Sequence, residues 1–534
     1  MKLLEALRKG NAGEDYIELD DGYVKLTKTT RSQLVALLTA AQTKDGKLEV
    51  PRGAVSMLAS VFGGEGVSLP QAMEKAAKEV RKALAEVPEV PRTLEAQLRP
   101  YQLEGYRWMA RLAGCGFGAC LADDMGLGKT LQIITVLLAR AKDGPSLVVA
   151  PASVCGNWRN EIRRFAPTLE PIVAMDDLKA AEKAGPRAVV LASYGYLLFH
   201  EDEFAKKKWN GLVLDEAQAL KNEAAKRTKL VKRFEAKFRI AATGTPIENK
   251  LLELWRIFDF LNSGLLGTSD AFEFRSMTDI KRLTKPLILR RLKGEVLDDL
   301  PTKTEVTRLV ELSKEERSEY EGCRLKALDE VERAEKKEKM AKMLAGLTRL
   351  RRFCSHPSLV LKNDRVASAK FDALAELMEE LREGGHRALV FSQFTDYLAI
   401  VRKMVEEKGW THQYLDGSTP LKERGKRVDA FQDGEGDFFL ISLKAGGTGL
   451  NLTAADYVII LDPWWNPAVE NQAADRAHRI GQTRPVTIYR LVVKDTVEEK
   501  VLALHDEKLS LAADMLDGTG SSALNSEILM GLLQ

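Results

Sequence analysis

Short runs of β-branched and other hydrophobic residues recur along the chain from about residue 117, and each run ends in a polar or glycine-rich turn. Helical patterns lie between them, such as LQIITVLLARA at 131–141. Hydrophobic strands that alternate with helices are typical of a parallel sheet buried on both faces. The strands expected in this first unit are FGACLA at 117–122, SLVVAP at 146–151, AVVLAS at 188–193, GLVLDE at 211–216 and RIAATGTP at 239–246.

The same alternation returns after about residue 363. A helix with Phe371, Leu374, Leu377, Met378 and Leu381 on one face is expected to stop at the glycine pair 384–385. Strands are then expected at about 387–394, 437–443, 456–462 and 486–493. The pattern therefore predicts an α/β protein with two parallel-sheet lobes.

Charged helical sequence separates the two units, and Ser313 with Glu316 has the spacing of a capping box that opens one helix. Residues before 92 hold short hydrophobic clusters, such as 34–40, and PEVPR at 88–92 is typical of a linker. A flexible join is expected after 515. The predicted organisation is an N-terminal accessory segment at 1–92, a first lobe at 93–250, helical insertions and a connector at 251–362, a second lobe at 363–500 and a C-terminal helical tail at 501–534.

Composition and charge limit the class of protein and the compartment in which it is expected. The chain has 534 residues, 45% of them hydrophobic, and a net charge of +3, so a nucleic-acid surface would be a local patch. No hydrophobic run approaches the roughly 20 residues of a membrane span, and the five cysteines form no disulfide or zinc pattern. Cys354 and His356 are too few for a zinc site. A soluble intracellular protein is expected, in the cytoplasm and at the nucleoid of a prokaryote or in a eukaryotic nucleus.

The stretch LADDMGLGKT at 121–130 ends like a phosphate-binding loop between a strand and a helix. Its general pattern has a glycine six residues before the lysine, where this chain has Asp123. Gly126 and Gly128 would let the backbone curl around phosphates, and the following helix N-terminus adds positive charge. Lys129 would reach the β- and γ-phosphates, and Thr130 would ligate magnesium.

Two further motifs fit the same chemistry. Asp215 and Glu216 follow a hydrophobic strand, where Asp215 would hold magnesium and Glu216 would polarise the attacking water. Arg476 and Arg479 are three apart in QAADRAHRIGQ and so share one helix face. An arginine supplied from outside the loop accelerates phosphoryl transfer by roughly 10³–10⁵. The predicted mechanism is a clamp that closes on ATP and opens after hydrolysis.

The order LRPYQLEGYRWM, DDMGLGKT, DEAQ, TGTPIEN, SLKAGGTGLNL and DPWWNPAVENQAADRAHRIGQ closely resembles the SWI/SNF family of DNA-translocating ATPases, within helicase superfamily two. The match covers about 95–515, and its compactness is similar to bacterial or archaeal members. It implies two RecA-like lobes, ATP and Mg²⁺. It also implies that DDMGLGKT is the family's own form of the loop, with an acid in place of the first glycine.

The resemblance implies a nucleotide site made by residues from several blocks. Gln102 corresponds to the adenine reader, Gln472 to the leading polar residue of the last motif, and Arg476 and Arg479 to its arginine fingers. Gln218 stands where many relatives have histidine, which leaves its coupling role open. The loop contributes Asp124, Met125, Gly126, Leu127, Gly128, Lys129 and Thr130.

Other blocks are expected to face the DNA backbone, because small side chains and exposed N–H groups suit phosphate contact without base reading. Trp464 and Trp465 have two alternatives, of which packing in the core is favoured over stacking on DNA, and Lys293 resembles part of the inter-lobe connector. The expected DNA contacts are Ser153, Asn157, Trp158, Thr243, Gly244, Ser392, Gln393, Lys444, Gly446, Thr448 and Asn451.

Three hypotheses follow. The first is an ATPase stimulated by double-stranded DNA, which steps along the duplex and remodels bound proteins without sustained strand separation. The second is a strand-separating helicase on DNA or RNA, against which the PWWNP and DRAHRIGQ blocks argue. The third is a non-catalytic scaffold, against which the intact Lys129, Asp215 and Glu216 argue. The remodelled complex, the oligomeric state and the role of residues 1–92 are not predicted.

Overall fold

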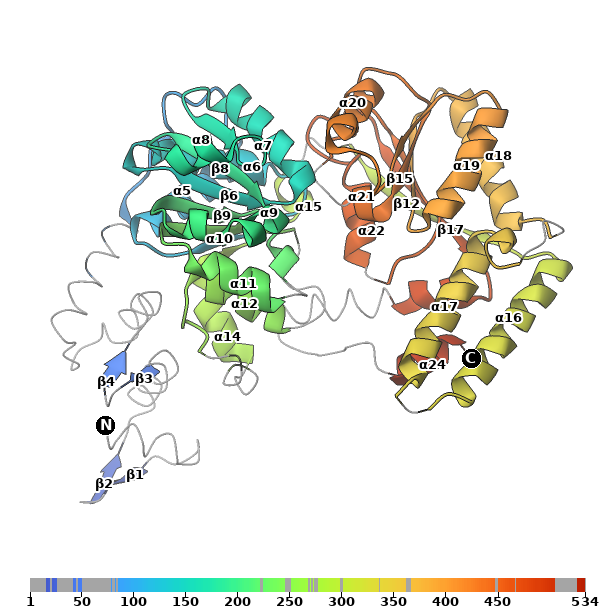
Figure 1. Ribbon diagram of the computed structural model, residues 1–534, viewed down its shortest axis with the longest axis horizontal. Helices are drawn as coiled ribbons and strands as arrows, with labels where there is room; N and C mark the ends of the chain where they lie inside the picture. The colour runs from blue at the N-terminus through green and yellow to red at the C-terminus, as the bar shows by residue number, and fades with distance from the viewer. Residues whose placement is uncertain are drawn as a thin grey trace.

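The computed structural model describes 85–220, 224–244, 251–267, 269, 272, 277–297, 301–335, 337–361, 366–446, 450–465, 467–504 and 526–533, with residues 78 and 82 and four short strands. Those strands form two antiparallel pairs, β1 (Tyr16–Leu19) with β2 (Gly22–Lys25) and β3 (Gln42–Lys44) with β4 (Lys47–Glu49). The expected cluster at 34–40 and the join after 515 lie outside the described residues. Most of the described chain forms two α/β lobes (Figure 1).

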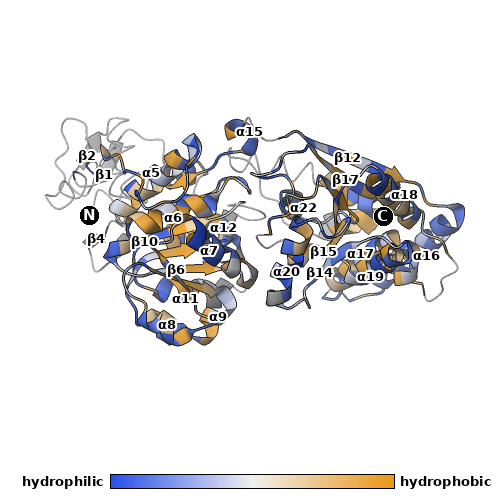
Figure 2. Ribbon diagram, turned by 90° about the horizontal axis from the view of Figure 1, so that it is seen from above, coloured by the Kyte–Doolittle hydropathy of each residue, from blue (hydrophilic) through white to orange (hydrophobic). Residues whose placement is uncertain are grey.

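The first lobe is built on a seven-stranded sheet in the order β11-β5-β10-β9-β6-β8-β7. Every neighbouring pair in it is parallel. The central strands are buried along their whole length and are hydrophobic in Figure 2, which confirms the predicted sheet. The strands are β5 (Ala119–Leu121), β6 (Ser146–Ala150), β7 (Glu170–Val173), β8 (Ala188–Ser193), β9 (Trp209–Leu214), β10 (Ala236–Ala242) and β11 (Ile288–Leu289).

Helices cover both faces of this sheet. They are α5 (Pro100–Gly114), α6 (Lys129–Ala139), α7 (Ala152–Phe165), α8 (Leu178–Lys183), α9 (Tyr194–Phe199), α10 (Glu201–Ala205), α11 (Ala224–Arg233), α12 (Leu251–Leu261) and α14 (Met277–Thr284). Short 3₁₀ turns occur at η1 (Ala141–Asp143), η2 (Ala217–Leu220) and η3 (Lys285–Leu287).

The predicted lobe boundary at residue 250 is wrong. The hydrophobic face of α12, including Ile257, Phe258 and Phe260, is buried in the core of the first lobe. Strand β11 then pairs with β5 at the edge of the first sheet. Sequence periodicity identified a charged helical region correctly but not the sheet against which its buried face packs.

The second lobe has a six-stranded, all-parallel sheet in the order β12-β17-β16-β13-β15-β14. Its strands are β12 (Lys303–Val310), β13 (Ala388–Ser392), β14 (His412–Leu415), β15 (Phe438–Ser442), β16 (Tyr457–Ile460) and β17 (Val486–Val493). Strand β12 lies inside the predicted insertion but belongs to this sheet. The helices are α18 (Ala369–Glu383), α19 (Thr395–Glu407), α20 (Leu421–Gln432), α21 (Leu443–Gly446) and α22 (Pro467–Ala474), while α15 (Lys293–Val296) lies in the connector.

A helical unit is attached to the second lobe (Figure 1). It consists of α16 (Lys314–Glu332), α17 (Lys339–Ser355) and α24 (Ser526–Leu533), which share one hydrophobic core, and η4 (Pro357–Leu359) follows α17. The predicted capping box is confirmed, since Ser313 Oγ accepts from Glu316 N at 3.2 Å and Glu316 Oε2 accepts from Ser313 N at 2.9 Å. Cys354 is buried in this core, and the described residues contain no group of three or more His, Cys, Asp or Glu side chains placed to hold a metal ion. No helix described is long and hydrophobic enough to span a membrane.

Candidate active site

The predicted catalytic segments of the first lobe meet at one edge of its sheet. Strands β5, β10 and β9 are neighbours, and the carboxyl ends of parallel strands share an edge. The phosphate loop follows β5, Thr243 follows β10, and Asp215 follows β9. Backbone bonds fix these ends: Thr243 N donates to Leu121 O at 3.1 Å, and Asp215 N donates to Val149 O at 2.8 Å.

The loop has the backbone of a phosphate cradle. Gly126 and Gly128 have φ of +84° and +73°, in the left-handed region that favours glycine. Helix α6 begins at Lys129, whose Nζ donates to the carbonyls of Asp123 at 2.6 Å and Asp124 at 3.2 Å. Burial lowers the pKa of Lys129, while the surrounding carboxylates raise it. The ammonium group therefore lies inside the loop, where it would exchange carbonyl partners for phosphate oxygens.

The other predicted nucleotide residues lie against this loop. Gln102 is buried, and its Nε2 donates to Leu127 O at 3.2 Å. A Cβ placed on Gly128 would lie 2.4 Å from that nitrogen and would displace the Gln102 amide, and the φ of +73° already favours glycine there. Met125 packs against Gly244 of the TGTP block, where a Cβ would lie 2.9 Å from Met125 Cγ.

Asp215 and Glu216 form a carboxylate pair in an unusual backbone conformation. Glu216 has φ of +49°, which costs a non-glycine residue roughly 1–2 kcal/mol. Its N–H donates to Asp215 Oδ1 at 2.9 Å. Burial raises the pKa of Asp215, and the neighbouring Glu216 carboxylate raises it further. This excess of negative charge, with the Thr130 hydroxyl at the start of α6, suits a hard oxygen-seeking cation such as Mg²⁺.

Trp158 was expected to contact DNA, and the structure corrects that prediction. Its side chain is fully buried, and Nε1 donates to Asp215 Oδ2 at 2.7 Å. The indole therefore has no surface to offer a DNA backbone and instead orients the carboxylate. Nothing in the local pattern PASVCGNW distinguishes these roles, because the partner lies 57 residues away in sequence.

Thr243 was also expected at the DNA surface, and it too is buried. Its Oγ1 donates to Gln218 Oε1 at 2.8 Å, and Gln218 Nε2 donates to Glu216 Oε2 at 2.5 Å. Gln218 thus uses both ends of its amide to join the block after β10 to the catalytic acid. An amide makes this link without a titratable group, unlike a histidine in the same place.

Both arginines of the second lobe reach the first-lobe site. Arg476 is 2% exposed, and its Nε and Nη2 have no hydrogen-bond partner among the described residues. Burial lowers the pKa of Arg476 to about 10, opposed most by Glu216, so the guanidinium stays charged at neutral pH. Arg479 lies against the loop, since a Cβ on Gly126 would be 2.9 Å from Arg479 Cβ. Gln472, on α22 of the same motif, is also largely buried.

The remaining DNA candidates divide between structural and exposed positions. Ser392 is buried and donates to Asp462, whose Oδ2 accepts from Gln393 N at 3.1 Å, so Ser392 is corrected to an internal role. Asn157 Nδ2 donates to Glu161 at 2.9 Å, and Asn451 is exposed. Both tryptophans 464 and 465 have rings beside the buried Arg351 guanidinium, as in the packing alternative. Ser153 lies in α7 and Lys444 and Gly446 in α21, but their side chains, and Thr448 entirely, are outside the described part.

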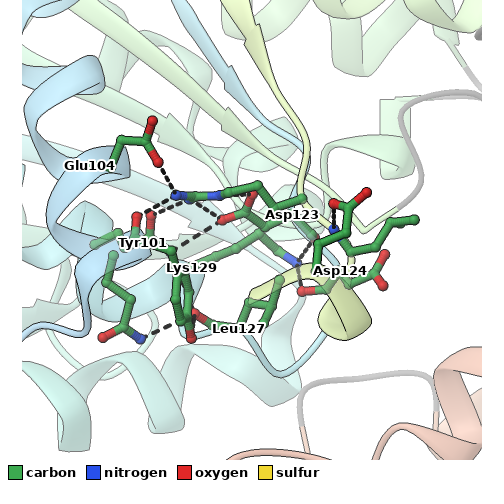
Figure 3. A network of polar contacts seen from close by, with 11 residues as sticks. Tyr101, Glu104, Asp123, Asp124, Leu127 and Lys129 are labelled. Carbon is green, nitrogen blue, oxygen red and sulfur yellow. Dashed lines mark hydrogen bonds and ion pairs between the residues drawn. The ribbon is translucent and has the colours of Figure 1, made fainter. Parts of the chain in front are cut away.

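Sequence reasoning missed a buried network around the residue that replaces the loop's first glycine (Figure 3). Asp123 is fully buried, and Arg291 binds it with two bonds, Nε to Oδ1 at 3.0 Å and Nη2 to Oδ2 at 2.5 Å. Arg291 Nη2 also donates to Gln132 Oε1 at 3.0 Å, and Nη1 donates to Tyr101 O. The acid at position 123 was a visible departure from the general loop, but its partner lies 168 residues away.

Comparison with known proteins agrees with this architecture. The SNF2-related domain family matches residues 101–359, and the helicase conserved C-terminal domain matches 369–481. A putative ATP-dependent helicase/translocase of Bacillus subtilis is 39% identical over 457 residues, which are 78% of this chain and 49% of that protein. The mouse SWI/SNF-related regulator of chromatin subfamily A member 1 is 37% identical over 78% of this chain and 43% of its own.

The Sulfolobus solfataricus SWI2/SNF2 ATPase core, solved in complex with dsDNA, is 34% identical, covers 84% of this chain and 99% of its own, and has a TM-score of 0.40. Two parallel-sheet lobes, with a glycine-rich loop on one and buried arginines on the other, are the arrangement expected of a two-lobe nucleotide-binding core. The chain belongs to the SNF2-related family. It spans about half the length of the curated relatives that it matches.

Proposed function

We propose that this chain hydrolyses ATP between its lobes and uses the cycle to move along double-stranded DNA. The observation that carries the proposal is the Arg476 guanidinium, a buried cation of the second lobe with unpartnered N–H groups beside the catalytic acid of the first. Burying a charge without partners is costly. A γ-phosphate between Lys129 and Arg476 would supply those partners, so the site is complete only with a nucleotide and both lobes.

Each residue has a distinct part in the reaction. The loop N–H groups and Lys129 hold the β- and γ-phosphates, and Gln102 contacts the base. Glu216 orients a water and accepts its proton as the water oxygen bonds to the γ-phosphorus and the bond to the ADP oxygen breaks. Arg476 and Arg479 stabilise the charge on the transferred group. Mg²⁺, held by Thr130 and Asp215, would neutralise phosphate charge.

Duplex DNA as the stimulating partner follows from the SWI/SNF motif series and from relatives named as helicases or translocases. The phosphate backbone would be contacted by both lobes, so that alternating grip and closure produce steps along the duplex. Proteins bound to that duplex would be displaced or moved. Contacts with phosphates predict an affinity that falls steeply with salt and depends little on base sequence.

The test is steady-state ATP hydrolysis with no nucleic acid, single-stranded DNA, duplex DNA or structured RNA at one salt concentration, with Lys129→Ala as the blank. Strong stimulation by duplex DNA, with ATP-dependent displacement of a triplex strand, is expected. Stimulation only by single strands or RNA, with unwinding of a forked duplex, would replace the proposal with a helicase. Turnover no higher than that of Glu216→Gln would leave a scaffold.

A further inference from the structure

The segment between the lobes runs directly along the phosphate loop. Strand β11 pairs with β5, and the pairing continues past it: Ala122 N donates to Leu289 O at 2.7 Å and Asp124 N donates to Arg291 O at 3.0 Å. The first residues of the loop therefore form part of the same ladder as the connector. A movement of one displaces the other.

Side chains anchor this ladder. The two-pronged ion pair between Arg291 and Asp123 is almost wholly buried, with 9% and 0% of the side chains exposed. Removing one partner of such a pair leaves an uncompensated buried charge. Asp123 thus replaces the loop's first glycine with an attachment point, which fixes the connector beside the nucleotide site.

Lys293 extends from this anchor to the second lobe. Its backbone N–H donates to Asp124 Oδ2 of the loop at 3.1 Å. Its Nζ donates to Asp475 Oδ1 at 2.5 Å and to His478 O at 2.7 Å. Asp475 immediately precedes Arg476, and His478 immediately precedes Arg479. One residue therefore binds the phosphate loop with its backbone and the arginine-bearing turn with its side chain.

The same contact has a hydrophobic part. Leu127 of the loop is fully buried with Tyr101 and Leu297, and Ile480, next to Arg479, packs against them. The Lys293 Cε is also 3.4 Å from the position of a Cβ on Gly126. The connector, the loop and the arginine turn thus meet at one point, where Lys293 binds the loop through its backbone N–H and the turn through its ammonium group.

We propose that Lys293 is a positioning residue that sets the distance between the phosphate loop and the two arginines. It acts through Asp475 and His478, whose oxygens accept from its ammonium group. The inference rests on the proposed ATP hydrolysis and deepens it. Without the Lys293 bonds to Asp475 and His478, the arginine turn can move away from the phosphate loop. Misplacement of a catalytic group by about 1 Å costs on the order of 100-fold in rate.

The experiment compares Lys293→Met with the matched control Lys303→Met, in DNA-stimulated turnover. Lys303 is the first residue of β12 and pairs with Glu305 at 2.6 Å, and among the described residues it has no bond to the loop or the turn. We expect Lys293→Met to lower kcat about 10- to 100-fold and to change the KM for ATP less than about threefold, whereas the control stays within twofold. Lys293→Arg, which keeps the charge, should recover much of kcat. A folded Lys293→Met with kcat within twofold of wild type overturns the proposal.

A double variant separates positioning from a general structural loss. Because Lys293 acts through the arginines, Lys293→Met should cost little more once Arg479→Ala is present. If the decreases in kcat caused by Lys293→Met and Arg479→Ala multiply in the double variant, the two residues act independently, and the proposal is overturned.

A lobe-distance measurement keeps the inference distinct from the proposed function. Donor and acceptor dyes would be placed at Lys183→Cys and Lys403→Cys, both exposed, with Cys115 and Cys323 replaced by serine. Energy transfer should fall in nucleotide-free Lys293→Met but not in Lys303→Met. If wild type shows no ATP turnover, the proposed function fails, and the dye measurement still tests whether Lys293 holds the phosphate loop and the arginine turn together. Equal energy transfer in Lys293→Met and wild type would then overturn the proposed role of Lys293 as well.

Discussion

Asp215 and Asp462 occupy equivalent places in the two lobes and have different roles. Each follows a central strand of a parallel sheet, β9 or β16, and burial raises the pKa of each carboxyl group. Asp462 accepts bonds from Ser392 and Gln393 and lies in the field of the cationic Arg351 and Lys370. The negative charge of Asp462 is balanced by cations of its own lobe, so this carboxylate has a structural role in that lobe.

Asp215, in contrast, has a second carboxylate as its neighbour. It accepts bonds from Trp158 and from the N–H of Glu216, but the Glu216 charge opposes its ionisation. Such a pair needs external positive charge, which Mg²⁺ and the second lobe's Arg476 would supply. The comparison teaches that a buried acid at a strand end marks a candidate cation site where a second carboxylate adds to its negative charge, even with a cation such as Lys129 in the same lobe.

The largest expected effect tests whether Arg476 of the second lobe supplies positive charge to the Asp215–Glu216 pair. Arg476→Ala should lower kcat by about 10³-fold or more, because an arginine finger contributes 10³–10⁵ to phosphoryl transfer. Arg484→Ala is the control, since that side chain is 62% exposed and 3.5 Å from Asp456. Single-turnover ATP hydrolysis with duplex DNA measures both. Equal rates for the two variants would show that the lobes do not share a site.

The next effect concerns the orientation of Asp215. Trp158→Phe removes the indole N–H but keeps an aromatic ring in the core, and we expect the Mg²⁺ concentration for half-maximal turnover to rise about 10-fold. Trp209→Phe is matched to it, since Trp209 is also buried and its Nε1 donates to Phe204 O at 3.1 Å, away from the site. A Mg²⁺ titration in which both variants behave alike would return Trp158 to a purely packing role.

A pH dependence follows from the raised pKa of Asp215. Ionisation of a group whose pKa is raised by folding disfavours the folded state, so without Mg²⁺ this group destabilises the fold as pH rises through its pKa. Protons then compete with Mg²⁺ in the mildly acidic range, above the ordinary aspartate pKa of about 4. The Mg²⁺ concentration for half-maximal turnover should therefore rise as the pH falls from 7.5 to 5.5. A constant requirement would contradict this assignment of the cation ligand.

The smallest effect compares the two acids directly, in Mg²⁺-free buffer. Asp462→Asn should lower the free energy of unfolding by about 1–3 kcal/mol, because it replaces an accepting carboxylate oxygen with an NH2 donor that faces a buried donor. Asp215→Asn also loses an acceptor but relieves repulsion with Glu216, so its cost should be smaller by about 1 kcal/mol, less than one pKa unit of interaction. Denaturant unfolding followed in each lobe measures the difference. A larger cost for Asp215→Asn would reverse the comparison.

The sequence by itself determined the elements and the inventory of the site. Strands 188–193 and 486–493 have the predicted bounds. The first is buried along its whole length and is a continuous hydrophobic run, as expected of a parallel strand covered on both faces. The glycines of the loop, Lys129 and the Asp215–Glu216 pair were also visible, since each depends on local backbone or on adjacent residues. Family membership followed from the order of these blocks.

Only the tertiary structure decided which residues meet. It assigned α12 and β11 to the first lobe and β12 to the second, because partners in a sheet are chosen by long-range pairing rather than by periodicity. It moved Trp158, Thr243 and Ser392 inward, each to a polar partner distant in sequence. It also joined Lys293 to both the phosphate loop and the arginine turn. Hydrogen bonds between segments more than 20 residues apart depend on the packing of whole elements, which no local pattern of side chains encodes.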